Sequence, residues 1–322
     1  MQTILLTGGA GYIGSHTCLV LLEKNFRVVV YDSFINSSKL AIQRVRKILE
    51  KKVSDLDRKL FIWEGDIRDE EVLRNAFRYF YQKKIPIKAV IHFAGLKAVG
   101  DSFKNSEEYW DVNVNGSITL LKVMDLYDCS KIVFSSSATV YDFSSNSPLK
   151  EFNKLKPTSP YGETKLEIEK ILKRQFFKKK ENWNNVILRY FNPIGAHSSG
   201  LIGEDPKTKP TNLLPLLIEA CSDFKTLEIY GNDWPTKDGT CIRDFIHVMD
   251  LAEAHLQSLL HIQNEQSKHL ILNVGTGRGT SILELIKIFE EVNQCTIKYK
   301  FSNRREGDIP ESIADNSLIL ST

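Results

Sequence analysis

Several features that would mark particular classes of protein are missing from this 322-residue sequence. Its cysteines are only Cys18, Cys129, Cys221, Cys241 and Cys295, which form no CxxC pair and no His/Cys spacing typical of zinc. Scattered thiols are typical of a reducing compartment. There is no secretory leader pattern, and no apolar run reaches the roughly 18 residues that span a bilayer. We therefore predict a soluble cytoplasmic protein without a metal site or a membrane partner.

A strong excess of charge is absent too. The 43 Lys and Arg residues nearly balance the 40 Asp and Glu residues, for a formal net charge of +3. Aromatic residues do not alternate with the lysine clusters as they do on nucleic-acid-binding surfaces, so we expect no nucleic-acid partner. Hydrophobic residues make up 42% of the chain, which is ordinary for a globular protein. The length predicts a large domain with an appended lobe.

The first 190 residues or so alternate short apolar runs with amphipathic segments. Strands that are apolar on both faces are typical of a parallel sheet covered by helices. The pattern therefore predicts an α/β fold, with a doubly wound parallel sheet of the Rossmann type. The expected strands are Thr3–Thr7, Arg27–Tyr31, Leu60–Glu64, Ala89–Phe93, Lys131–Ser135 and Val186–Tyr190, and the expected helices are Ser15–Lys24, Glu70–Gln82, Asn115–Leu126 and Thr164–Phe177.

The pattern changes after Asn192-Pro193, where segments shorten and turn residues gather. Two helix–strand passages follow at Asp250–Leu260 and Thr280–Glu291. We predict an NAD-binding Rossmann domain over residues 1–191 and a smaller α/β substrate lobe over 192–322. Some C-terminal segments of the lobe are expected to return to the first domain.

Glycines at 8, 11 and 14 follow the first strand and open the first helix. A dinucleotide-binding loop needs a tight turn and close backbone approach, which leave no room for Cβ atoms. The helix N-terminus then faces the phosphates. Asp32 ends the second strand 18 residues after Gly14, where a carboxylate can accept hydrogen bonds from ribose hydroxyls. No Arg or Lys follows at once to receive a 2′-phosphate, so NAD is favoured over NADP.

Tyr161 and Lys165 are four residues apart and so share one face of a helix that Pro160 can start. A tyrosine with a pKa of about 10 is a poor base at neutral pH. A nearby ammonium and a positive nicotinamide would lower that pKa. Ser137 comes at the C-terminal end of the fifth strand, where ligands of such sheets bind. These three residues are the candidate catalytic group.

Longer strings carry a resemblance that covers nearly the whole chain. They are T-G-G-A-G-Y-I-G-S-H-T at 7–17, G-D-I-R at 65–68, V-I-H-F-A-G-L-K-A-V-G at 90–100, F-S-S-S-A-T-V-Y at 134–141, S-P-Y-G at 159–162, R-Y-F-N-P at 189–193, F-I-H-V-M-D-L-A at 245–252 and R-R-E-G-D at 304–308. The chain resembles the UDP-glucose (UDP-galactose) 4-epimerases of the extended short-chain dehydrogenase/reductase family.

That resemblance implies a tightly bound NAD that is not consumed. Tyr161 would exchange the proton of the sugar 4-hydroxyl while hydride leaves C4, Ser137 would hold the 4-oxygen, and the 4-keto sugar would turn over before hydride returns. It also implies a homodimer, formed by helices such as those expected around Asn115–Leu126 and Thr164–Phe177. The implied cofactor-binding residues are Gly8, Gly11, Tyr12, Ile13, Gly14, Asp32, Ser33, Phe34, Asn36, Ser37, Asp66, Ile67, Phe93, Ala94, Gly95, Lys97, Tyr161, Lys165 and Phe191. The implied UDP-sugar-binding residues are Lys97, Ser137, Tyr161, Asn192, Asn212, Leu213, Tyr230, Arg243, Arg305, Asp308 and Ser312.

Four features depart from the family pattern. Val112 stands where an Asn is usual near the cofactor, and Asp142 stands where a Gly is usual. The chain ends at Thr322, before a typical family C-terminus, so missing helical cover is expected. Ser312 stands where some members carry Tyr beside the sugar, and a small side chain predicts room for a 2-N-acetyl group.

Three functions compete with the epimerase. A nucleotide-sugar 4,6-dehydratase needs an Asp-Glu pair directly after the active-site hydroxyl residue, and here Ala138 and Thr139 occupy those places. The second is a non-catalytic NAD-sensing paralogue, and the third is a different nucleotide-sugar-modifying member of the family. Retention of the catalytic group and of both uridine-side arginines favours the epimerase.

Overall fold

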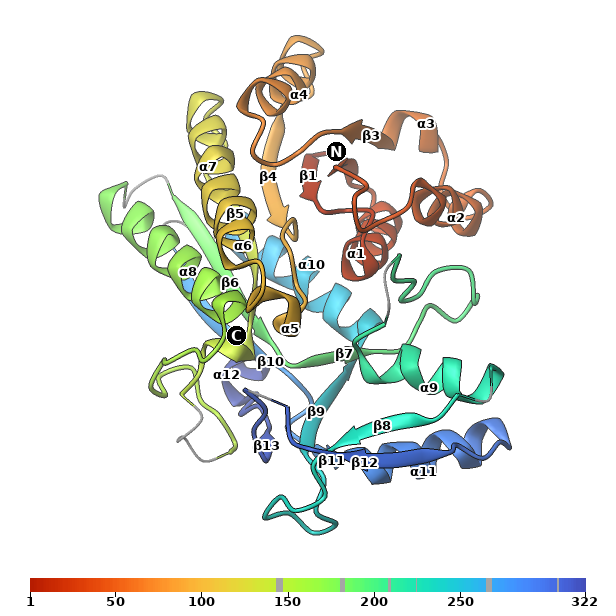
Figure 1. Cartoon of the computed structure of the whole chain (residues 1–322). Helices are drawn as coiled ribbons and strands as arrows, with labels where there is room; N and C mark the ends of the chain where they lie inside the picture. Colours follow the sequence, from red (N-terminus) through yellow and green to blue (C-terminus); the bar gives the residue numbers. More distant parts are fainter. Residues whose placement is uncertain (143–146, 180–182, 208–209, 224, 265–267, 306) are drawn as a thin grey trace.

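A seven-stranded parallel sheet forms the centre of the computed structural model, which describes residues 1–142, 147–179, 183–207, 210–223, 225–264, 268–305 and 307–322 (Figure 1). Its strands run in the order β10-β6-β5-β4-β1-β2-β3, and each neighbouring pair is parallel. The strands are β1 (Thr3–Thr7), β2 (Arg27–Asp32), β3 (Leu60–Glu64), β4 (Ile87–His92), β5 (Lys131–Ser137), β6 (Asn184–Tyr190) and β10 (His269–Val274).

Helices cover both faces of this sheet, as the strands' apolar residues require. One buried cluster joins the sheet to α1 (Tyr12–Glu23), α2 (Lys39–Leu49) and α10 (Val248–Asn264). A second cluster, on the other face, joins it to α4 (Glu70–Gln82), α7 (Gly116–Leu126) and α8 (Pro160–Lys178). The predicted doubly wound fold is confirmed.

Two elements from the second half of the chain lie against the central sheet. The passage Asp250–Leu260 belongs to α10, which packs against α1 in the first apolar cluster. Strand β10 follows α10 and pairs with β6 at the edge of the sheet. Periodicity does not identify which C-terminal segments lie here, because it reports what a segment buries and not against which partner.

Several short elements lie between the strands of the central sheet and the long helices. They are α3 (Leu56–Lys59), α5 (Val99–Ser102), α6 (Ser106–Tyr109), a π-helix η1 (Trp110–Asn115) that leads directly into α7, and a 3-10 turn η2 (Ala138–Val140). The helix expected from Asn115 therefore begins as a π-helical segment further upstream, and such segments are frequent at functional sites.

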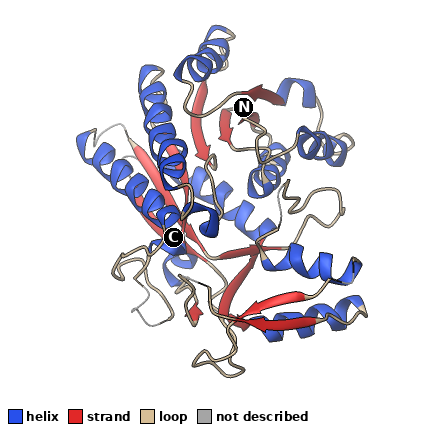
Figure 2. Cartoon of the chain, viewed as in Figure 1, coloured by secondary structure: helices blue, strands red, loops and turns tan. Residues whose placement is uncertain are grey.

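The remaining elements gather below the sheet in the orientation of Figure 2. A four-stranded sheet contains β7 (Asn192–Ile194), β9 (Ile242–His247), β11 (Gly279–Ser281) and β13 (Glu311–Ser312). Strands β8 (Leu227–Tyr230) and β12 (Tyr299–Ser302) form a separate pair, and α9 (Leu213–Ser222) and α11 (Ile282–Asn293) pack in a third apolar cluster with them. The short α12 (Ser317–Ser321) contacts β10. Among the described residues, no helix combines the length and apolar character needed to cross a membrane, and no group of three or more His, Cys, Asp or Glu could hold a metal ion.

We expect two buried histidines to make the stability of the fold depend on pH. Burial lowers the pKa of His92 to about 3 and that of His255 to about 4. Below about pH 6.5, the usual pKa of histidine, these side chains bind protons in the unfolded chain but not in the folded one. The free energy of unfolding therefore falls as the pH falls. Each histidine contributes about 1.4 kcal/mol per pH unit in that window.

Chemical denaturation between pH 7 and pH 5 measures this slope. His255→Gln should flatten it, because the contribution of this buried histidine disappears. The control is Ser258→Ala on the same helix, which removes no titratable group and should leave the slope as it is. An unchanged slope in His255→Gln would contradict the assignment.

Candidate functional site

The strand order of the central sheet reverses between β1 and β4, which is where ligands of such sheets bind. The glycine loop follows β1, and Phe93-Ala94 follows β4. Gly8 has φ +67°, and a Cβ added there would lie 2.7 Å from the Ala94 nitrogen. A Cβ on Gly14 would lie 2.4 Å from the Gly8 oxygen. The loop therefore touches both strands' ends and depends on its glycines for that contact.

The start of α1 is suited to an anion. Its N-cap is Gly11, and among the described residues no side chain caps this end. The first turn, which begins at Tyr12 and Ile13, contains no acidic residue. The N–H groups of a first helical turn have no intrahelical acceptor, and they carry the positive end of the helix dipole. This uncapped end, beside a glycine loop without side chains, fits a dinucleotide pyrophosphate.

Asp32 organises the loop after β2. Its buried carboxylate accepts hydrogen bonds from the Ala10 nitrogen at 2.9 Å, the Phe34 nitrogen at 2.9 Å and the Ser37 hydroxyl at 2.7 Å. These bonds hold Phe34 in the left-handed region, at φ +56°. The acidic residue thus links the glycine loop to the proposed ribose-binding segment, in which Ser33 is half-buried and Asn36 is exposed.

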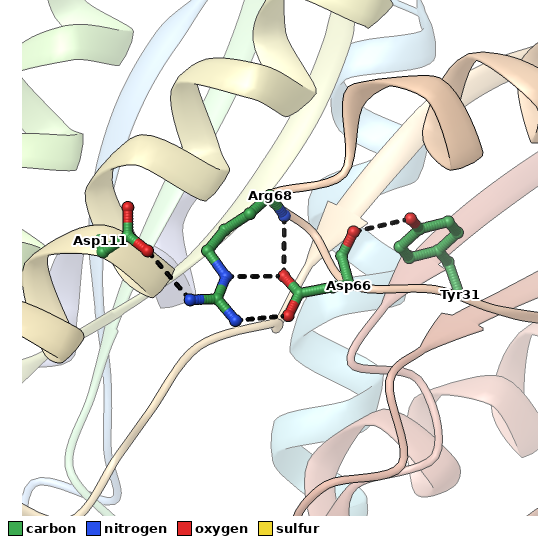
Figure 3. A network of polar contacts seen from close by, with 4 residues as sticks. All are labelled: Tyr31, Asp66, Arg68 and Asp111. Atoms are coloured by element: carbon green, nitrogen blue, oxygen red, sulfur yellow. Dashed lines mark hydrogen bonds and ion pairs between the residues drawn. The ribbon is translucent and has the colours of Figure 1, made fainter.

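Figure 3 shows a network of polar contacts around Asp66, one of the implied cofactor-binding residues. The Arg68 guanidinium contacts both Asp66 oxygens, at 3.0 and 2.7 Å, and reaches Asp111 of η1 at 2.9 Å. The Tyr31 hydroxyl donates to the Asp66 carbonyl at 2.8 Å. Hydrogen bonding from Arg68 lowers the pKa of Asp66, so this carboxylate is charged at neutral pH. Neighbouring Ile67 is buried.

The three residues of the candidate catalytic group lie together where the start of α8 packs against the end of β5. Ser159 caps α8 by accepting from the Gly162 nitrogen at 3.1 Å, and Pro160 follows as the first helical residue. This start buries the side chain of Tyr161, whose phenol lies close enough to the Ser137 hydroxyl for that hydroxyl to influence its pKa. The Lys165 ammonium, also buried, donates to the Ser135 carbonyl at 2.9 Å. Phenol, serine hydroxyl and ammonium are therefore adjacent.

Burial controls the ionisation of this group. It raises the pKa of Tyr161, and the nearby Ser137 hydroxyl opposes that rise. Burial also lowers the pKa of Lys165 to about 8, against the opposing charge of Glu169. The lowering of the phenol pKa by Lys165 stays a prediction, because desolvation is the dominant influence on Tyr161 here. A phenolate at this place needs additional positive charge beside it.

Other residues of the site were not found from the sequence. Asn113 of η1 accepts from the Leu96 nitrogen at 2.7 Å and donates to the Thr164 hydroxyl at 3.0 Å, so it joins the loop after β4 to α8. Glu204 accepts from Lys97 at 3.1 Å and from Asn212 at 2.6 Å. Neither residue belongs to a motif with a local signal, and only the folded chain brings their partners together.

The expected uridine-side residues occupy three places. Arg243 of β9 approaches Asp308 at 3.4 Å, and Ser312 of β13 is its register partner. The guanidinium of Arg305 stacks 3.9 Å above the Tyr230 ring. The remaining residues stand at the starts of two elements, where Asn192 begins β7, Asn212 is the N-cap of α9 and Leu213 is its first residue. Glu306 of the R-R-E-G-D string lies outside the described residues.

One glycine places the uridine-side turn near the catalytic helix. A Cβ built on Gly307 would come within 3.8 Å of the Thr158 hydroxyl, just before α8. Tyr12 makes a second link, since its hydroxyl donates to the Gly195 carbonyl at 2.6 Å. Phe191 is buried beside Tyr141 in a small apolar cluster. Of the four departures, Val112 packs against the second apolar cluster, and Asp142 pairs with Lys154 at 3.0 Å.

Comparisons with known proteins agree with this geometry. The model of the NAD dependent epimerase/dehydratase family matches residues 4–275. A UDP-glucose 4-epimerase of Bacillus subtilis is 46% identical over 315 residues, which is 98% of this chain and 89% of that protein.

Solved structures give the same result. The UDP-glucose-4-epimerase of Stenotrophomonas maltophila, with bound NAD and formylated UDP-arabinopyranose, superposes with a TM-score of 0.92 at 39% identity, covering 100% of this chain and 92% of that one. The Bifidobacterium longum UDP-glucose 4-epimerase, in complex with NAD+ and UDP, gives 0.89 at 42% identity, covering 98% and 90%. The chain therefore belongs to the NAD dependent epimerase/dehydratase family.

Proposed function

We propose that the chain is an isomerase that interconverts UDP-glucose and UDP-galactose by epimerisation at C4, with NAD as a bound cofactor. The observation that carries the proposal is the adjacency of Tyr161, Ser137 and Lys165 in a dinucleotide fold that also carries the uridine-side residues. Ala138 and Thr139 follow Ser137 in the η2 turn, where a dehydratase needs an acid/base pair.

The residues have separate tasks in this reaction. Tyr161 removes the proton of the 4-hydroxyl and later returns one, and the Ser137 hydroxyl holds the same oxygen. The Lys165 ammonium stabilises the phenolate. NAD held by the glycine loop and by the segment after Asp32 would supply the acceptor for hydride from C4 and the donor for its return to the opposite face of the 4-keto sugar. Arg243 and Arg305 anchor the pyrophosphate of UDP while the keto sugar turns over, because a guanidinium matches phosphate oxygens in a planar, bidentate geometry.

A coupled assay of UDP-galactose conversion to UDP-glucose by the purified chain tests the proposal, together with the NAD content of the protein. Turnover without added NAD is expected, since the reaction consumes none. NAD binding without any turnover would support the sensing paralogue instead.

Ser312 predicts that N-acetylated UDP-hexoses are substrates as well. Ser312 lies on β13 opposite Arg243, and its side chain is much smaller than the Tyr of some family members. We expect measurable turnover of UDP-N-acetylgalactosamine, and Ser312→Tyr should lower it roughly tenfold or more relative to UDP-galactose, since overpacking costs about 1–3 kcal/mol. Turnover of UDP-galactose alone by the unaltered chain would contradict this expectation.

We further propose a cytoplasmic homodimer that uses the outer faces of α7 and α8, where Leu126 and Phe177 expose 58% and 54% of their surface. The free thiols of all five cysteines support a reducing compartment. The division into a first domain of residues 1–191 and a second lobe of residues 192–322 is also a proposal. In this division, α10 and β10 come from the second range but pack with the first domain. Light scattering tests the assembly, and a monomer would contradict it.

A further inference from the structure

A buried ion pair lies outside the residues that the proposed reaction uses. Glu169 of α8 and Arg189 of β6 are 4% and 1% exposed. Their contact is bidentate, with Nε to Oε1 at 2.9 Å and Nη2 to Oε2 at 2.6 Å. Replacing a buried pair of this kind by apolar residues is often neutral or stabilising, so stability alone does not explain it.

The pair sits one helical turn beyond the catalytic ammonium. Tyr161, Lys165 and Glu169 follow one another at intervals of four residues, so they share one face of α8. Glu169 also accepts from the Ser136 hydroxyl of β5 at 2.5 Å. Ser136 and Arg189 are register partners in the sheet, one residue before Ser137. The ion pair thus fastens α8 to β5 and β6 directly beside the place where Tyr161 meets Ser137.

The same arginine connects the helix to a distant segment. Its Nη1 donates to the Tyr141 hydroxyl at 3.2 Å, and Tyr141 donates to Asn273 of β10 at 2.6 Å. Asn273 in turn donates to the Leu149 carbonyl at 2.7 Å. The Leu149 nitrogen donates to the carbonyl of residue 313 at 2.8 Å, next to Ser312. A continuous set of hydrogen bonds therefore runs from the catalytic helix to residue 313, directly after the strand β13.

We propose that Glu169 is a positioning residue for the epimerisation: held by Arg189 and Ser136, it fixes the face of α8 that carries Tyr161 and Lys165 against β5 and aligns this face with β13. The inference rests on the proposed function. It adds that the contacts of Glu169 set the distance between the base, Tyr161, and the sugar. A base must lie within hydrogen-bond reach of its proton, so a small shift of α8 lowers turnover more than binding.

Charge gives the pair a second measurable effect. The titratable groups that face the Lys165 ammonium are Tyr161 and Glu169 on its own helix and His92 on β4. The Glu169 carboxylate opposes the lowering of the Lys165 pKa by burial. Loss of this carboxylate lets the ammonium lose its proton at lower pH, so the alkaline limb of the activity profile should move to lower pH.

Glu169→Gln tests the proposal, with kcat, KM for UDP-galactose, NAD content and the pH profile as readouts. We expect kcat to fall roughly tenfold or more, an effect of the size found for misplaced catalytic groups. KM and NAD content should stay within about twofold, and the alkaline limb should shift to lower pH. The matched control is Glu167→Gln, which removes an exposed pair with Lys170 and Arg174 on the same helix and should change none of these values.

The double variant Glu169→Met/Arg189→Met separates positioning from folding. It removes both buried charges, so the protein should be folded and hold NAD, yet kcat should stay low and the alkaline limb shifted. The proposal is overturned if Glu169→Gln has the kcat and pH profile of the unaltered chain, or if the double variant regains them. Absence of turnover in the unaltered chain would refute the proposed function itself, which is a distinct outcome.

Discussion

Replacing Tyr161 by Phe is expected to lower turnover of UDP-galactose by about 10²–10⁴-fold, the usual contribution of a general acid/base. The substitution removes one oxygen from a buried ring and leaves the packing of α8 intact. NAD content and melting temperature should therefore change little. Steady-state rates at saturating substrate, measured with equal amounts of NAD-loaded protein, give the comparison.

Tyr109→Phe is the matched control. Tyr109 is also a buried tyrosine, and its hydroxyl donates to the Ala98 carbonyl at 2.7 Å. It has no place in the proposed reaction, so its loss should cost stability and leave kcat within about threefold, as for one lost hydrogen bond away from the chemistry. Full activity of Tyr161→Phe would remove this tyrosine from the mechanism.

Gly14→Ala is expected to abolish stable retention of NAD. A Cβ at this position would lie 2.4 Å from the Gly8 oxygen and 2.7 Å from the Gly9 Cα, and neither backbone atom can move without opening the loop. Overpacking costs about 1–3 kcal/mol, which corresponds to roughly a 5- to 150-fold loss in affinity if the loop takes the strain. The NAD released on denaturation should fall well below one equivalent per chain, and turnover should then depend on added NAD.

Gly100→Ala is the control for this experiment. Gly100 lies in the short helix α5, and a Cβ there meets nothing within 4 Å. Alanine is the better helix former, so this variant should keep its NAD and match the unaltered chain in stability or exceed it. Undiminished NAD content in Gly14→Ala would show that the loop does not hold the pyrophosphate.

The fold was largely predictable because its first half follows local rules. Apolar strands such as β1 and β3 are bounded by glycine or polar turns, and their limits match the prediction. The later strand β10 carries the same kind of pattern, but it joins the sheet after an excursion through another set of elements. No local signal records such a return, because it is decided by which edge of the sheet remains open.

The candidate site likewise has one part that local sequence features predict and another part that they do not. Glycines and the Tyr161–Lys165 spacing are local features, and the helix start at Pro160 brings the pair to β5 as predicted. Contacts that depend on long separations were missed, among them Glu204 with Asn212. The ionisation of Tyr161 was also beyond reach, because burial is a property of the packed molecule.

The return of α10 to the first sheet has a consequence for biosynthesis. Helix α1 is buried on nearly all sides, and α10 supplies part of its cover through Leu251, Leu256 and Leu259. A ribosome delivers the glycine loop first and this cover much later, since chains are made at about 5–20 residues per second from the N-terminus. The nascent Rossmann half therefore keeps an apolar face exposed until α10 emerges. Chaperone contact during translation should centre on that face.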